Sequence, residues 1–153
     1  MDSWYNRSVA LDELMPLIRE SLSQGKSVRF SPRGTSMLPM LRQGKDQVIL
    51  SPVTGKLHRF DLPFYQRDDG QYVLHRIVKA GDTYTCMGDN QFVMEPGVRH
   101  DQIIAVATGF VRDGKEHSVH EFTHKCYCRL WFYSRHLRHL WRGGIGWLRR
   151  HLK

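Results

Sequence analysis

The chain has 153 residues, 41% of them hydrophobic, and a formal net charge of +8 at pH 7. This length suffices for one hydrophobic core and excludes two full domains, while three irregularly spaced cysteines exclude a disulfide framework and fit a reducing compartment. No segment reaches the roughly 18 consecutive apolar residues that span a bilayer, and residues 1–20 lack a signal-peptide pattern, so we expect a cytoplasmic protein.

The first predicted element is an N-terminal helix in the segment 1–25, running from residue 8 to about residue 23. Its apolar residues recur at helical spacing, and they are Val9, Leu11, Leu14, Leu17, Ile18 and Leu22. Gly25 marks the end of the helix, whereas Pro16 predicts either a later start or a kink. We interpret this helix as a packing element, with a partner-binding role as the alternative.

A domain of short strands is predicted next, over residues 26–122. The strands are expected at residues 27–30, 47–50, 62–65, 72–78, 84–87, 103–112 and 117–122, and turn clusters such as 67–70 separate them. Several short strands at this spacing favour a mainly β protein, built as a compact barrel or folded sheet.

A serine lies in a turn bounded by glycine and proline, Gly34-Thr35-Ser36-Met37-Leu38-Pro39, between two of the predicted strands. A serine hydroxyl is a poor nucleophile and needs a neighbouring base. His75, in a later strand, can be that base near neutral pH, because an unperturbed imidazole titrates at about 6.5. Taken singly, each residue is also typical of an ordinary turn or strand.

Two acids are candidates for a third member, which would orient the imidazole of His75 and stabilise its charged form. Asp89 belongs to the turn Gly88-Asp89-Asn90, and Glu95 follows it. Backbone N–H groups beside the serine are expected to stabilise an oxyanion and to bind substrate. The residues assigned to that role are Gly34, Thr35 and Met37.

These motifs together resemble a known family. The superfamily of signal peptidase I and LexA-like serine peptidases has segments similar to Gly-x-Ser-Met-x-Pro, His-Arg-Ile-Val and Gly-Asp-Asn. The histidine in the second segment makes the chain similar to the branch of signal peptidases that use a Ser/His pair. The resemblance covers roughly residues 28–110. It implies a coiled β-fold of the LexA and signal peptidase type, a serine endopeptidase without a cofactor, Ser36 as nucleophile, His75 as base and Glu95 at the position of the acid.

The chain departs from the family pattern at three places. Lys45 separates Gly44 from Asp46, which are usually adjacent, and Phe60 precedes Asp61 where a second Gly-Asp is expected. Glu95 replaces an aspartate, so the longer side chain leaves Asp89 as the alternative support for the histidine.

From residue 125 to residue 153 the pattern is helical and basic. This segment holds eight Lys and Arg and no acid, so the whole net charge belongs to it. Its apolar residues share one arc of a helical wheel, and they are Leu130, Leu137, Leu140, Trp141, Ile145, Leu148 and Leu152. The opposite arc holds Arg135, Arg138, Arg142, Arg149, Arg150 and Lys153. Gly143, Gly144 and Gly146 predict two short helices joined by a hinge.

Three interpretations of this tail remain open. It is a membrane-surface anchor on anionic lipid, a nucleic-acid arm, or a terminal helix that packs its apolar face on the β-domain. We expect the first, with the protein peripheral on the inner face of a membrane, and we do not expect a nucleic-acid partner. A zinc site is a further candidate, with ligands among His117, His120, His124, Cys126 and Cys128, but Cys-x-Cys spacing does not match a common finger and no metal is expected.

The sequence therefore predicts a serine peptidase-like domain that cleaves a peptide or protein substrate. The substrate would bind extended beside the strand that leads into Ser36. Two alternatives stay open, namely a catalytically idle peptide-binding module at a membrane surface and a LexA-like regulator that cleaves itself.

Overall fold

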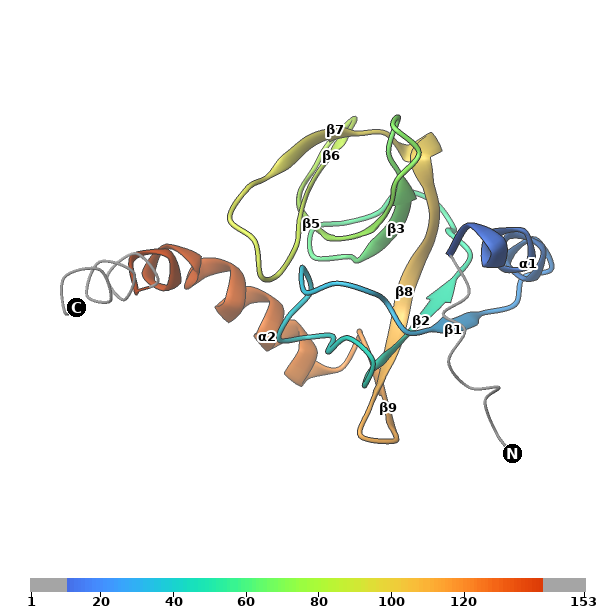
Figure 1. Ribbon diagram of the computed structural model, residues 1–153. Helices are drawn as coiled ribbons and strands as arrows, with labels where there is room; N and C mark the ends of the chain where they lie inside the picture. Colours follow the sequence, from blue (N-terminus) through green and yellow to red (C-terminus); the bar gives the residue numbers. More distant parts are fainter. Residues whose placement is uncertain (1–10, 142–153) are drawn as a thin grey trace, which may run out of the picture.

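The computed structural model of this protein describes residues 11–141, and within them two antiparallel sheets form a mainly β body, as predicted (Figure 1). The larger sheet has, in spatial order, β1 (Val28–Phe30), β2 (Gln47–Ser51), β8 (Ile103–Arg112), β3 (Pro63–Gln66) and β4 (Tyr72–Leu74). The smaller sheet has β5 (Arg76–Ala80), β6 (Tyr84–Met87) and β7 (Glu95–Val98). The remaining elements are β9 (Lys115–Ser118), which pairs with β8, a short 3-10 helix (His100–Gln102), and helices α1 (Leu11–Ser23) and α2 (Phe122–Tyr133).

The chain passes from the larger sheet to the smaller one at His75. The single strand predicted over residues 72–78 is wrong, because β4 ends at Leu74 and β5 begins at Arg76. β4 pairs with β3, whereas β5 pairs with β6, so one continuous strand would have to belong to two sheets. The break places His75 at the junction between the sheets.

Helix α1 covers one face of the larger sheet. It runs through Pro16 and is followed by Gly25, whose positive φ of 74° suits a residue without a side chain. Met15, Ile18 and Leu22 are its buried residues. The prediction that Leu17 belongs to the packing face is wrong, because 62% of its surface is exposed. Residues 8–10 of the predicted helix lie outside the described residues.

The predicted strands differ from the structure at two other places. β7 was not predicted, because Pro96 and Gly97 lie within it, and pairing with β6 outweighs their low strand propensity. The strand predicted over residues 117–122 is wrong beyond Ser118. The side chain of Glu121 accepts a hydrogen bond from the N–H of Ser118, which closes a turn, and α2 begins at the next residue.

Three hydrophobic clusters hold these elements together. The first lies between α1 and the larger sheet, and the second lies between the two sheets around Tyr65, Ile77 and Cys86. In the third, Phe132 of α2 packs against Val78 and Met87 of the smaller sheet. Figure 1 shows α1 and α2 on opposite sides of the β body. None of the helices within residues 11–141 is long and apolar enough to cross a membrane.

Candidate active site

The loop between β1 and β2 carries Ser36 and is fixed by a buried carboxylate. Asp46 is fully buried and accepts hydrogen bonds from the backbone N–H and the guanidinium of Arg42, at 2.6 to 3.1 Å. The Arg42 guanidinium holds the pKa of Asp46 below its usual range, despite the opposing effect of burial. Arg112 of β8 reaches the same carboxylate at 3.5 Å and donates to the carbonyl of Pro39 at 2.6 Å. The loop is therefore attached to the central strand of the larger sheet.

The turn at residues 88–90 holds the backbone of the serine from the other side. The N–H of Asn90 donates to the carbonyl of Ser36 at 2.8 Å, and its side-chain amide donates to the carbonyl of Thr35 at 3.1 Å. A Cβ atom at Gly88 would lie 2.7 Å from the Ser36 carbonyl oxygen, closer than real contacts allow. Glycine is thus required at residue 88 because two backbone segments meet there.

Ser36 and His75 line the same cavity, of about 250 Å³, although 38 residues separate them in sequence. One wall comes from the residues that follow β1, and the other comes from β4 and Gln71. Gly34 and Met37 also line the cavity, whereas Thr35 is exposed to solvent. The N–H of Gly34 donates to the side chain of Gln43 at 3.2 Å, so that group has a partner inside the loop.

His75 is buried, with 6% of its surface exposed, and its Nδ1 atom has no hydrogen-bond partner among the described residues. Burial, together with the charge of Arg67, lowers the pKa of His75 to about 4, although Glu95 and Asp89 oppose these effects. The imidazole is consequently neutral at pH 7. Its pKa lies well below the ordinary value of about 6.5 on which the sequence argument relied.

Glu95 is the acid that lies beside the histidine, with its Oε2 atom 4.0 Å from His75 Nδ1. Two other side chains bind the same carboxylate. The Tyr65 hydroxyl donates at 2.7 Å, and the Arg67 guanidinium donates to both oxygens at 2.7 Å. Arg67 above all keeps the pKa of Glu95 below its usual range. The carboxylate therefore stays ionised next to the imidazole.

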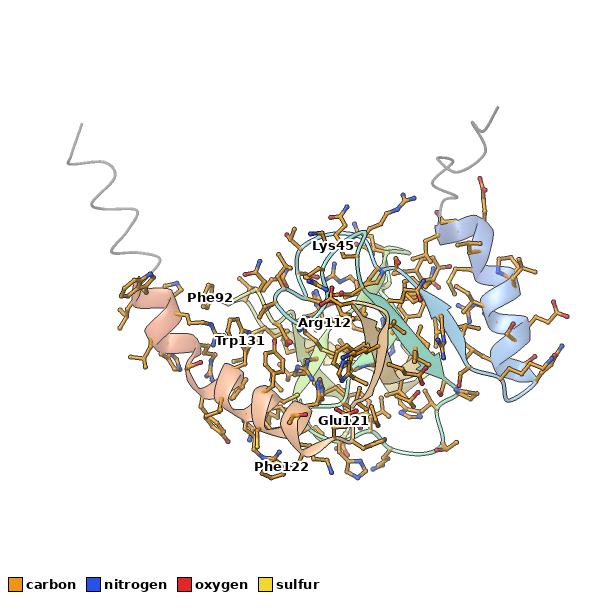
Figure 2. The ribbon with its side chains drawn as sticks, turned by 90° about the horizontal axis from the view of Figure 1, so that it is seen from below. Lys45, Phe92, Arg112, Glu121, Phe122 and Trp131 are labelled. Atoms are coloured by element: carbon orange, nitrogen blue, oxygen red, sulfur yellow. The ribbon has the colours of Figure 1, made fainter. Side chains whose placement is uncertain are left out.

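Asp89, the other candidate acid, has different partners. It forms a buried ion pair with Arg76, in which both oxygens accept hydrogen bonds at 2.8 Å. The Tyr127 hydroxyl of α2 donates to the same carboxylate at 2.9 Å, and the Trp131 indole donates to the Asp89 carbonyl at 2.6 Å. Figure 2 shows Trp131 between α2 and the β body. Asp89 thus connects α2 to the turn that holds Ser36.

No motif in the sequence marks Tyr65, Arg67 or Arg76 as parts of this region. Arg76 directly follows His75, and its sequence context is also that of a solvated arginine on a strand. The structure shows that it is buried and bound to Asp89. Arg67 fell in a predicted turn, which the structure contains, and nothing in the sequence relates it to Glu95. The contacts of Tyr65 and Arg67 with Glu95 depend on the pairing of β7 with β6, which nothing in the sequence indicates.

The candidate zinc ligands are divided between two elements, with His117 on β9 and His124, Cys126 and Cys128 on α2. His124 and Cys128 lie one turn apart on α2, with 3.3 Å between Nε2 and Sγ, and His117 stacks on Phe110. Across residues 11–141, no group of three or more His, Cys, Asp or Glu side chains is arranged to hold a metal ion.

Comparisons of the chain with protein-family models, with curated proteins and with solved structures give no match. The functional assignment accordingly rests on the motifs and on the geometry of this cavity.

Proposed function

We propose that this protein is a serine endopeptidase similar to signal peptidase I, with Ser36 as nucleophile and His75 as general base. The observation that carries the proposal is the position of both residues on one cavity, with His75 Nδ1 lying 4.0 Å from Oε2 of Glu95. With Nδ1 on the side of the acid, Nε2 is the ring nitrogen that would serve the serine hydroxyl, as in other Ser-His-acid sites.

In the proposed reaction, the Ser36 hydroxyl attacks the carbonyl carbon of the scissile peptide bond while His75 takes its proton. The imidazolium then gives this proton to the leaving amine as the C–N bond breaks, and an acyl-enzyme forms. Water, deprotonated by the same imidazole, hydrolyses the ester and restores the serine. The ionised Glu95 would stabilise the transient charge on the imidazolium through a distance of 4.0 Å.

The position of the cavity at the edges of the larger sheet favours a peptide as the substrate. β1 and β4 are the two ends of its main strand order, and the cavity is lined by the residues after β1 and by the whole of β4. An extended peptide could add main-chain hydrogen bonds to either edge and so present its backbone carbonyl to Ser36. We further propose that the two sheets, joined at His75, correspond to the coiled β-fold of the LexA and signal peptidase type.

The test is cleavage of a proteome-derived peptide library by the purified full-length chain, read by mass spectrometry. The wild type should generate new termini that disappear in Ser36→Ala and in His75→Ala. Ser23→Ala, at an exposed serine of α1 whose hydroxyl donates to the carbonyl of Glu20, is the matched control and should cleave as the wild type does. Equal cleavage by wild type and Ser36→Ala would refute the proposal.

A catalytically idle peptide-binding module is the second candidate, and the environment of His75 favours it. A pKa of about 4 makes the imidazole a weak base, and Arg67 and Tyr65 already bind the carboxylate of Glu95. In this case, no variant or wild-type protein would cleave the library. Peptides retained by the immobilised wild type would then be lost when the cavity is filled by Gln71→Trp, which lines it without belonging to the catalytic pair.

A further inference from the structure

Helix α2 and the helical residues that follow it to Trp141 have two different faces. The inner face packs on the β body through buried His124, Cys128 and Phe132. The outer face carries six large apolar side chains that are 62 to 80% exposed, namely Phe122, Leu130, Tyr133, Leu137, Leu140 and Trp141. These six share an arc of about 100° on a helical wheel. Figure 2 shows Phe122 on the outer side of the helix.

This arrangement decides one of the three interpretations of the tail. Packing of the leucine face on the β-domain is wrong for residues 130–141, because those leucines point to solvent. Arg135 and Arg138, the members of the predicted opposite arc among the described residues, lie inward instead. The guanidinium of Arg138 lies 3.6 Å from the Trp131 ring centre, and that of Arg135 lies 4.1 Å from the Phe132 ring centre.

Basic residues border the outer face and no acid interrupts it. Lys125, Arg129 and His136 are exposed and follow one edge of the arc. From residue 122 to residue 153 the sequence contains no Asp or Glu. The twelve residues that lie beyond the described helix add four Arg and Lys, together with Trp147 and further apolar residues. The apolar stripe therefore has a basic edge and belongs to an acid-free segment of net positive charge.

The C-terminal part of the helix projects beyond the β body in both views (Figures 1 and 2). A flat surface can therefore contact the outer face along its length without meeting the sheets. Six exposed large apolar side chains on one face of a helix, with a basic edge, are typical of a contact surface rather than of a solvated helix.

We propose that the outer face of α2, defined by the six apolar residues above, binds the surface of an anionic lipid bilayer, with the helix in the plane of the interface. Leucine, tryptophan and tyrosine would enter the boundary between headgroups and acyl chains, and Lys125 and Arg129 would contact lipid phosphates. A second copy of the chain would bring two acid-free basic surfaces together, so charge disfavours it as the occupant. Nucleic acid would contact phosphates through a basic centre, whereas the centre of this face is leucine.

The test is flotation of the full-length protein with vesicles of neutral phosphatidylcholine or of a phosphatidylcholine and phosphatidylglycerol mixture. The wild type should float with the anionic vesicles, at least tenfold more than with the neutral ones, and high salt should reduce the bound fraction. The double variant Leu137→Glu and Leu140→Glu should lose at least tenfold in binding. Because both residues are exposed, its far-UV circular dichroism should match that of the wild type.

The control is Leu17→Glu, which introduces the same charge at a comparably exposed leucine of α1, on the opposite side of the body. It should float as the wild type does. Equal binding by the double variant and the wild type would overturn the proposal, as would no binding by the wild type at low salt.

Dimerisation in sedimentation experiments that the double variant abolishes, without vesicle binding, would assign the face to a second copy. Duplex DNA binding that the double variant abolishes, without vesicle binding, would assign it to nucleic acid. The assay does not use peptidase activity, so its outcome is independent of the proposed function.

Discussion

Two buried histidines are predicted to make the fold sensitive to mild acid. Burial, with the charge of Arg67, lowers the pKa of His75 to about 4, and burial, with the charge of Arg76, lowers that of His124 to about 4. In the unfolded chain both imidazoles return to about 6.5. Between about pH 6.5 and pH 4 the unfolded state binds protons that the folded state does not. The contribution of the two neutral histidines to the free energy of unfolding is therefore fully present above about pH 6.5 and is lost as the pH falls toward 4.

The size of the effect follows from the two pKa values. At pH 5 an imidazole with a pKa of 6.5 is almost fully protonated, whereas one with a pKa of about 4 is about one tenth protonated. The free energy of unfolding should therefore be lower at pH 5 than at pH 7.5 by about 2 kcal/mol for each histidine, or about 4 kcal/mol together. Carboxylates contribute little at pH 5, because most remain ionised in the unfolded chain.

The measurement is urea unfolding at pH 7.5 and at pH 5, followed by far-UV circular dichroism. The wild type should lose about 4 kcal/mol between the two pH values, and His75→Gln or His124→Gln should each lose about 2 kcal/mol. Each substitution also changes packing, but that cost is the same at both pH values and cancels in the difference. His136→Gln, at an exposed position after α2, controls for the replacement itself.

Two results would refute this reasoning. One is a wild-type difference below about 1 kcal/mol, which would mean that the histidines have similar pKa values in the two states. The other is a difference that neither substitution reduces, which would assign the acid sensitivity to other groups.

Three more predictions concern the surroundings of the site. Arg67→Gln removes a charge that lowers the pKa of His75, so the acid limb of the pH profile of kcat/KM for peptide cleavage should move to higher pH. Gly88→Ala places a Cβ atom 2.7 Å from the serine carbonyl oxygen and should cost about 1–3 kcal/mol in urea unfolding, with slower cleavage. Asp89→Asn leaves the buried guanidinium of β5 without its charge partner and should cost about 3–5 kcal/mol in the same assay.

Each of these has a control and a contrary outcome. An acid limb that stays in place in the arginine variant would exclude that charge as a cause of the low pKa. Gly81→Ala should be tolerated, because its Cβ would meet only the carbonyl oxygen of Thr83 at 3.6 Å, and equal costs at both glycines would contradict the close-approach argument. Asp113→Asn removes the exposed partner of Arg42 and should cost no more than about 1 kcal/mol. An equally small cost for the buried aspartate would contradict the role of its ion pair.

The order of short strands could be predicted from the sequence because alternating apolar residues and glycine-rich turns act locally. β2, β6 and β8 occur where the pattern predicts them, within a residue at either end. β7 could not be found in this way, since Pro96 and Gly97 disfavour a strand and only the pairing with β6 stabilises it. The face of α2 that packs stayed open for the same reason, because the sequence shows which residues are apolar but not which surface the helix meets.

The sequence by itself determined the mainly β class and supplied the candidate serine, histidine and acids, since motif and periodicity are properties of neighbouring residues. Only the tertiary structure decided which of them meet. The change of sheet at His75 brings its ring to the cavity of Ser36, and β7 brings Glu95 to Nδ1. Asp89, equally acidic in the sequence, is instead bound to Arg76 and α2. Burial then determines the charge of the imidazole, because desolvation depends on the packing of segments that are distant in the chain.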